Sequence, residues 1–339
     1  MMKTIKLIFS LIIFGTFLQS CSTDVDLYAD YKDITVVYGL LDPTKDTTFI
    51  KINKAFLGPG NALEIAQIAD SCNYPEKLNC RIIEYSSTAG GNFTQTRVFD
   101  LDTITIHDKE SGVFYSPNQL VYYTTGTIRN NTDFHRYKYA LEIDHADTTL
   151  RGETNIVGGP SFSIVQSYLN LSNKIPNGTI KFYPCPNAAI YDAEITFRYL
   201  ELTPNNDTIP RYMNWKLETK ADSDFLPEHG QYNYTFNPSV FQQMLAYQLG
   251  DDTLKMVDRL LEEYPLTVKI SAGGEELYNF ISVNGPSTSI SQNVPEYSNI
   301  AGGYGVFSSR THIIKNVKMS PQSLTELTVD HENWRFRQI

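Results

Sequence analysis

The chain has 339 residues, with 28 Lys and Arg against 38 Asp and Glu, which gives a formal net charge of -10. Hydrophobic residues make up 41% of it and charged residues only 19%, so the chain can bury a substantial core and is not intrinsically disordered. The acidity, together with the lack of a basic cluster or recognition motif, argues against a nucleic-acid partner.

Residues 1–20 have the features of a signal peptide. Lys3 and Lys6 precede an apolar run over residues 7–18, which is too short to span a membrane as a helix. The run ends in the sequence LQSC, which resembles the bacterial lipobox, and its cysteine is Cys21. We expect cleavage before Cys21 and membrane anchoring through acyl chains on this residue. The alternatives are a plain secretory signal with a cysteine nearby or an uncleaved anchor.

Residues 21–30 are expected to form a lipidated acidic tether. Removal of residues 1–20 takes away two positive charges and no negative ones, which changes the formal charge from -10 to -12, so the anchoring is lipidic and not electrostatic. The stretch STDVD after Cys21 resembles the acidic signal that sends Bacteroidota lipoproteins to the outer face of the outer membrane. The alternative is a solvated linker on a lipoprotein that faces the periplasm.

Three cysteines follow Cys21 in the chain. Cys72 and Cys80 enclose a short loop and are candidates for a disulfide, which an oxidising compartment would permit. Cys185 is then left over. It lies between prolines without an adjacent base, so we expect a buried or free thiol. No CxxC pair or nearby histidine supports a metal site.

The strand pattern predicts a mainly β protein with two domains. Residues 31–154 are expected to form an antiparallel sandwich of immunoglobulin or transthyretin type, because short segments rich in β-branched and aromatic residues alternate with turn residues. The sequence GGP at 158–160 is the expected linker. The predicted strands of this first domain are 34–38, 48–52, 81–85, 96–99, 103–106, 120–123 and 137–143.

Residues 161–339 are expected to form a β-dominated domain with inserted helices. Helices are predicted near 238–264 and 274–281. The first region is divided into a helix that begins near Pro238 and a second one that begins at residue 252 or 253 and ends before Pro265. The predicted strands are 163–165, 178–183, 193–200, 211–217, 266–270, 305–309 and 312–314.

Several segments together resemble a Bacteroidota outer-membrane lipoprotein family that is a domain of unknown function. They are the lipobox, VDL at 25–27, ITVVYG at 34–39, YKYALEI at 137–143 and NIAGGYGVF at 299–307. The distinctive part is the block Asn-Ile-x-Gly-Gly-x-Gly-x-Phe, and the resemblance covers nearly the whole mature chain. Members are commonly found beside TonB-dependent transporters, which implies an accessory role in nutrient uptake. The family supplies no catalytic residues.

No motif indicates catalysis, a metal or a cofactor. The six histidines are scattered without HExxH spacing, and no GxSxG elbow, Walker loop or dinucleotide fingerprint is present. The glycines at 302–305 lack the following Lys-Ser/Thr of a phosphate loop. The adjacent acidic pairs at 262–263 and 275–276 are unlike the facing carboxylates of a glycosidase. We therefore expect no catalytic residues and a protein that is not an enzyme.

Aromatic residues are the candidates for ligand binding, since their flat faces and polar edges suit sugars or peptides. Tyrosine is also a common strand former, so the alternative is that these residues pack a sheet face. The candidates are Trp215, Tyr232, Tyr234 and Tyr304, together with Tyr122 and Tyr123.

An Asp-Thr dipeptide recurs five times and resembles the Bacteroidota O-glycosylation acceptor. Asp-Thr also forms turns and helix caps, so only a subset is expected to be modified. The candidate threonines are Thr47, Thr103, Thr148, Thr208 and Thr253.

Taken together, these features predict a lipid-anchored outer-membrane protein, exposed at the cell surface, that helps a TonB-dependent transporter capture a glycan or peptide. A structural or adhesive surface protein is the second hypothesis. A hydrolase without a recognisable motif is the third.

Overall fold

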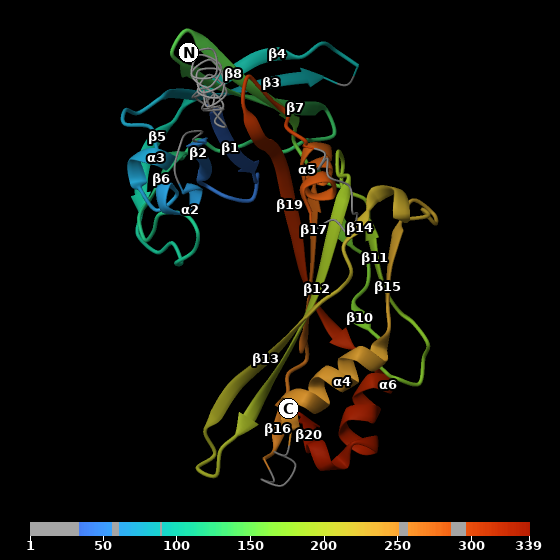
Figure 1. Cartoon of the computed structure of the whole chain (residues 1–339). Coiled ribbons are helices and arrows are strands. Elements are labelled where there is room, and N and C mark those ends of the chain that lie inside the picture. Colours follow the sequence, from blue (N-terminus) through green and yellow to red (C-terminus); the bar gives the residue numbers. More distant parts are fainter. Residues whose placement is uncertain (1–33, 56–60, 89, 251–256, 286–295) are drawn as a thin grey trace, which may run out of the picture.

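The computed structural model describes residues 34–55, 61–88, 90–250, 257–285 and 296–339. The protein is mainly β, as the sequence predicts, with few helices. Figure 1 shows an upper body, a stem of long strands and a lower body that carries helices. The lipobox, Cys21 and Thr253 lie outside the described residues.

The first half of the chain contains all seven predicted strands. An eighth strand, β8, follows β7 through a tight turn, and two short helices lie between β2 and β3. The elements are β1 (Ile34–Leu41), β2 (Thr48–Ala55), α2 (Ala62–Ile65), α3 (Ala69–Cys72), β3 (Asn79–Thr88), β4 (Thr94–Asp100), β5 (Asp102–Ile106), β6 (Gln119–Thr124), β7 (His135–His145) and β8 (Thr148–Asn155).

Two facing sheets form the upper body as a β-sandwich. One contains β4, β3, β7 and β8, extended by β18 (Ile300–Ala301), and the other contains β1, β2, β6 and β5. Buried residues alternate along β1, as expected of a strand that covers a core with one face. The shared core includes Val37, Ile50, Ile82 and Phe307. The last of these comes from the far end of the chain.

The second half of the chain is also β-rich and carries the longer helices. In Figure 1, α4 and α6 lie together in the lower body, beside the long strands. The strands are β9 (Ser163–Ile164), β10 (Tyr168–Leu169), β11 (Gly178–Tyr183), β12 (Ile190–Leu202), β13 (Thr208–Lys216), β14 (Lys220–Ala221), β15 (Tyr232–Phe236), β16 (Arg259–Leu261), β17 (Leu266–Gly273), β19 (Tyr304–Met319) and β20 (Phe336–Gln338). The helical elements are η1 (Asp222–Asp224), α4 (Pro238–Leu249), α5 (Glu275–Asn284), α6 (Pro321–Thr325), η3 (Glu326–Asp330) and η4 (Glu332–Trp334).

The helix that begins near Pro238 and the helix near 274–281 are confirmed as α4 and α5. The prediction of another helix between them is wrong for its C-terminal part, because residues 259–261 form β16, which pairs with β12 and β20. Arg259 and Leu261 are buried and the residue between them is less so, which is the alternation of a strand. In the sequence, the apolar residues of this strand fitted helical spacing. The expected start of that helix lies outside the described residues.

Strand β19 connects the two halves. The sequence suggested two short strands here, but residues 304–319 form one continuous strand. Its first part pairs in parallel with β1, and its second part pairs antiparallel with β17. A single 12-stranded sheet therefore runs through both halves, and Figure 1 shows β19 passing from the upper body into the stem.

The distinctive block NIAGGYGVF forms the crossing between the two sheets of the sandwich. The Asn299 side chain accepts a hydrogen bond from the Phe307 N–H at 2.9 Å and donates one to the Phe307 carbonyl at 2.7 Å. Gly305 has φ +112°, and a Cβ there would lie 1.9 Å from the Val37 carbonyl oxygen of β1. The block therefore has a structural role in placing β19 beside β1.

Candidate functional site

Most of the aromatic residues predicted to bind a ligand lie in the core. Trp215 packs against Phe236, with ring centroids 5.3 Å apart, and the exposed fractions of Trp215, Tyr232 and Tyr234 are 7%, 9% and 0%. Side chains buried to this degree present no face to a sugar. The alternative weighed above, that they pack one face of a sheet, describes them correctly.

The remaining aromatic candidates are divided between core and surface. Tyr122 is 1% exposed, so its ring offers no surface for a ligand to stack on. Its hydroxyl accepts a hydrogen bond from the Leu78 N–H within the sandwich. Tyr123 is half-buried beside Phe49. Tyr304 is 47% exposed at the start of β19 and stays a candidate.

The predicted disulfide between Cys72 and Cys80 is wrong, since both are free thiols, as is Cys185. Cys80 is the second residue of β3 and packs in the sandwich core, whereas the Cys72 thiol donates to the Ala66 carbonyl at 3.6 Å. Burial raises the pKa of Cys80 to about 12 and also raises that of Cys185. These thiols are therefore protonated and unreactive at neutral pH.

The described Asp-Thr threonines differ in exposure. Thr148 and Thr208 are exposed at the turns of the β7–β8 and β12–β13 hairpins, whereas Thr47 and Thr103 are half-buried. Thr148 and Thr208 are therefore the more accessible of the four. Their O-glycosylation stays a prediction.

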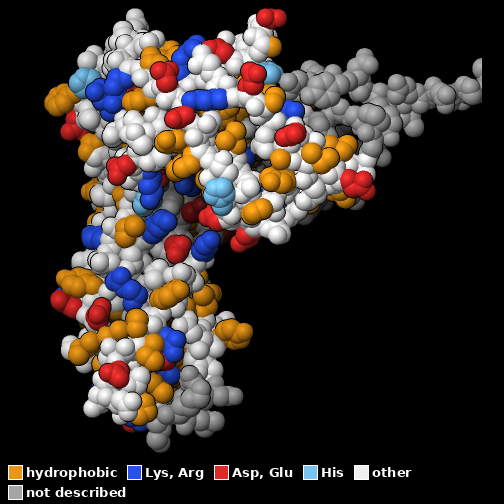
Figure 2. Space-filling model, turned by 90° about the vertical axis from the view of Figure 1, so that its left-hand side faces the viewer, with side chains coloured by type: hydrophobic (Ala, Val, Ile, Leu, Met, Phe, Trp, Pro, Cys, Tyr) orange, Lys and Arg blue, Asp and Glu red, His pale blue; other side chains and the backbone are white. Residues whose placement is uncertain are grey.

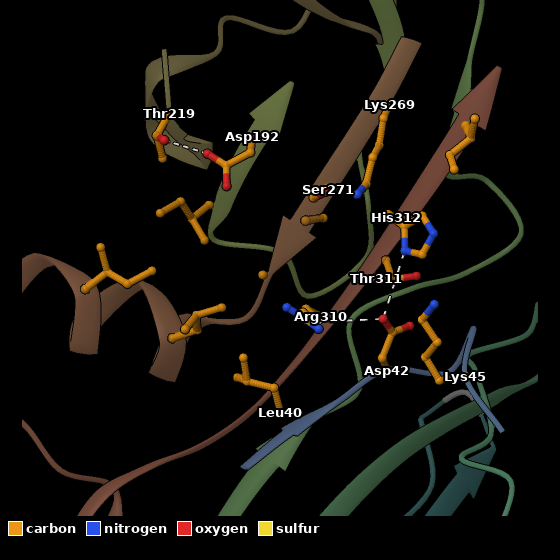
Figure 3. A pocket seen from close by; sticks show the side chains of 16 residues that line it. Leu40, Asp42, Lys45, Asp192, Thr219, Lys269, Ser271, Arg310, Thr311 and His312 are labelled. Carbon is orange, nitrogen blue, oxygen red and sulfur yellow. Dashed lines mark hydrogen bonds and ion pairs between the residues drawn. The ribbon is translucent and has the colours of Figure 1, made fainter. Parts of the chain in front are cut away.

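A cleft of about 730 Å³ lies where β19 passes from β1 to β17, and we call it the junction cleft. Figure 2 shows charged side chains of both signs and histidine gathered at the waist between the upper and lower bodies, and Figure 3 shows the cleft itself. Its apolar end is formed by Leu40, Leu277 and Ile281. Its polar end contains Asp42, Lys45, Asp192, Lys269, Arg310 and His312.

The sheet register sets the polar end of the junction cleft. Asp192 of β12 lies opposite Ser271 of β17, which in turn lies opposite His312 of β19. Lys269 and Arg310 are two residues away on their strands and therefore face the same side. Three strands that are distant in sequence thus bring a carboxylate, a hydroxyl and three basic side chains to one surface.

Asp42 faces two basic side chains of the junction cleft. It is 6% exposed, and its Oδ1 accepts hydrogen bonds from the Thr44 backbone and hydroxyl at 3.0 and 2.6 Å. Its Oδ2 faces Arg310 Nε at 3.8 Å and His312 Nδ1 at 4.0 Å. One buried carboxylate oxygen therefore lies near two basic side chains.

The other charges of the cleft are less fully paired. Burial is the largest cause that lowers the pKa of His312; Asp42 opposes it, and the nearby positive charges add to it. His312 is therefore neutral at pH 7. Lys45 and Lys269 form no ion pair within the part of the chain that the structure describes. The cleft therefore has spare positive charge in an acidic protein.

Ser271 and His312 are neighbours but are not arranged as a nucleophile and its base. No hydrogen bond joins these two described side chains, and the His312 ring nitrogen that does not face Asp42 points away from Ser271 (Figure 3). A nucleophile and its base must lie within about 3 Å of each other. The geometry favours binding over nucleophilic catalysis.

The junction cleft continues as a groove over the exposed face of the sheet. A second hollow of about 340 Å³ shares Asp192, Thr219, Lys269 and Ser271 with it and extends towards β13. Tyr212 of β13 lines neither hollow but lies farther along the same sheet face as Lys269, where it is 68% exposed and pairs with Arg198 of β12. We call the cleft and this face together the polar groove.

Further hydroxyl and amide groups line this face of the sheet. Thr196 donates to Asn214 at 2.9 Å, and Thr267 donates to Asn316 at 2.9 Å. The opposite face of the same strands is apolar and packs in the core, for example through Phe197. Only the outer face is therefore available to a polar ligand.

Within the described residues, no helix is long and apolar enough to cross a membrane. No group of three or more His, Cys, Asp or Glu side chains in the same residues is placed to hold a metal ion. No protein-family model and no curated protein sequence matches this chain.

Proposed function

We propose that the protein is a lipid-anchored accessory protein of the outer membrane that captures an extended polar ligand, a glycan or a peptide, for a TonB-dependent transporter. The observation that carries the binding part is the polar groove, which runs from the junction cleft over an exposed sheet face. The lipobox and the family resemblance support the anchoring and the partner.

The chemistry of the polar groove supports this ligand class. Hydroxyl, amide and carboxylate groups offer both donors and acceptors, as a chain of sugar hydroxyls or peptide groups requires. The exposed ring of Tyr212 provides a flat apolar face. Lys269, which forms no ion pair with another described residue, can donate to a ligand oxygen.

A binding experiment tests the groove. Full-length protein in mild detergent is screened against oligosaccharides and peptides, and ligands that bind are titrated by calorimetry. We expect the double variant Lys269→Ala, Tyr212→Ala to bind such a ligand at least about tenfold more weakly, because a charge-assisted hydrogen bond and a stacking surface are lost together.

The matched control is Lys77→Ala. Lys77 is an exposed lysine whose only described partner is Asp102, at 2.8 Å, and it lines neither the cleft nor its extension. It should leave the affinity unchanged. Wild-type affinity of the double variant would contradict the assignment of the groove, and a screen without any ligand would favour the structural or adhesive hypothesis.

The partner is tested separately. The tagged protein is purified from native membranes in mild detergent, and co-purifying proteins and the acylation of Cys21 are identified by mass spectrometry. We expect a TonB-dependent transporter in stoichiometric amount. Recovery of the protein alone, or only with structural surface proteins, would reject the uptake hypothesis and favour adhesion.

A further inference from the structure

A second cavity, unrelated to the polar groove, lies in the upper body. It has a volume of about 420 Å³, within the usual range of small-ligand pockets. Its floor is formed by β1 and β2, one wall by α3, and its roof by the loop of residues 107–118. We call it the lysine pocket, because Lys51, Lys54 and Lys109 line it.

Hydrogen bonds hold the roof and the wall in place. The Tyr115 N–H donates to the Ala66 carbonyl at 2.8 Å, and the Gln67 side chain donates to the Gly112 carbonyl at 2.9 Å. The Asn53 side chain of β2 donates to the Cys72 carbonyl at 2.8 Å. These contacts fix the walls of the lysine pocket in the absence of a ligand.

The charges of the lysine pocket are uncompensated. Lys51 donates to the Leu120 carbonyl at 2.8 Å and Lys109 to the Tyr115 carbonyl at 2.7 Å, so each ammonium group uses one of its three donors. No carboxylate of the described chain lines the pocket, and this includes Asp108 and Glu110 next to Lys109. In a chain of net charge -10, positive charges gathered without a carboxylate indicate a place for a negative ligand.

The remaining lining is suited to the apolar part of such a ligand. Phe114 and Tyr115 form the roof, and Val36, Tyr38 and Ala55 contribute to the floor. The side-chain amides of Asn53 and Asn73 already donate to backbone carbonyls of the protein, so the lysines remain the main hydrogen-bond donors for a ligand. We propose that the lysine pocket binds a small organic carboxylate, with Lys51 and Lys109 on the carboxylate oxygens and the aromatic roof over its apolar body.

The ionisation of Lys51 agrees with this inference. Burial is the largest cause that lowers its pKa to about 8, and the positive charge of Lys109 lowers it further. Besides Lys51 and Lys109, the titratable groups at the pocket are Lys54, the phenols of Tyr38 and Tyr115, and the Cys72 thiol, whose pKa is raised by burial. A bound carboxylate would stabilise the charged form of Lys51, so binding should weaken as the pH rises above 8.

The test uses phenylacetate and hexanoate as probes and phenylacetamide as the neutral match. Each is titrated into full-length protein in mild detergent by calorimetry at pH 7. We expect at least one carboxylate to bind at least about tenfold more tightly than the amide, and to lose about tenfold in affinity in Lys51→Met and in Lys109→Met. The affinity should also fall between pH 7.5 and 9.5.

Two controls make the result decisive. Lys77→Met should bind as the wild type. The midpoints of thermal unfolding of Lys51→Met and Lys109→Met should lie within about 4 °C of the wild type, because each loses one hydrogen bond to a backbone carbonyl and relieves a crowded positive charge. Lys269→Ala should also bind the probe as the wild type, which separates this site from the polar groove. Equal binding of acid and amide, unchanged affinity in both pocket variants, or no binding to folded wild-type protein would overturn the proposal.

Discussion

Gly305→Ala is expected to prevent stable folding, with a loss of at least about 4 kcal/mol in the free energy of unfolding. The added Cβ would lie 1.9 Å from the Val37 carbonyl oxygen, which is backbone and cannot rotate away, and φ at this position is +112°. Relief of the overlap would require β19 to move off β1, and this contact joins the two halves. Thermal unfolding followed by circular dichroism measures the effect.

Gly112→Ala is the matched control for this substitution. Nothing lies within 4 Å of a Cβ at Gly112, and its φ is in the ordinary negative region. It should change the free energy of unfolding by no more than about 0.5 kcal/mol. A Gly305→Ala protein that unfolds at the wild-type temperature would show that the β1–β19 contact is not as close as described.

Glu84→Gln is expected to cost about 3–5 kcal/mol, although the two side chains have nearly the same size. Glu84 is fully buried in the upper body. Its carboxylate forms an ion pair with Arg97 and accepts hydrogen bonds from Thr96 and Tyr139, both at 2.8 Å. The amide cannot balance the guanidinium charge and places an N–H where an acceptor is needed. Urea unfolding at pH 7 measures the difference.

The pH dependence of Glu84 gives a second readout. Burial alone would raise its pKa, but the hydrogen bonds from Arg97, Thr96 and Tyr139 outweigh it and hold the pKa below the usual value of 4.5. The stability that Glu84 contributes is therefore complete above pH 4.5 and is lost as the pH falls through the lowered folded-state pKa. The difference between wild type and Glu84→Gln should shrink over that range.

An exposed carboxylate in an ion pair is the control. Glu263 pairs with Lys318 at 2.5 Å and its side chain is 68% exposed, so Glu263→Gln should change stability by less than about 1 kcal/mol. If Glu84→Gln were equally mild, the buried cluster would not be a stabilising unit of the upper body.

The sequence predicts the β-rich fold well because strand formation leaves a local signal. Alternating apolar and polar residues, together with turn residues, identify seven of the eight strands in the first half of the chain, and the strand missed is β8. Strand β19 was split in prediction because Arg310 and Thr311 interrupt its apolar pattern. The continuity of β19 depends on its neighbouring strands. The strand pairs with β1 up to residue 309 and with β17 from residue 310, so its apolar pattern changes where the neighbouring strand changes.

The candidate sites were not predictable from the sequence in the same way. Asp42, Lys269 and His312 are far apart along the chain, and the pairing of β19 with both β1 and β17 brings them together. The aromatic residues chosen from the sequence were mainly core residues, because an alternating tyrosine in a strand looks the same whether it faces inward or outward. Tyr212, whose ring is 68% exposed, was overlooked.

The pairing of β1 with β19 has a consequence for how the protein is made. Val36 near the start of the described chain lies beside Tyr304 near its end, so the contact order of this sheet is high. While the polypeptide is being synthesised, β1 emerges before the other described strands and keeps an unpaired edge until nearly all of the chain has followed. Such an edge is prone to aggregation. The upper body therefore cannot complete its fold in vectorial order, and a nascent chain stopped before residue 304 would retain this open edge.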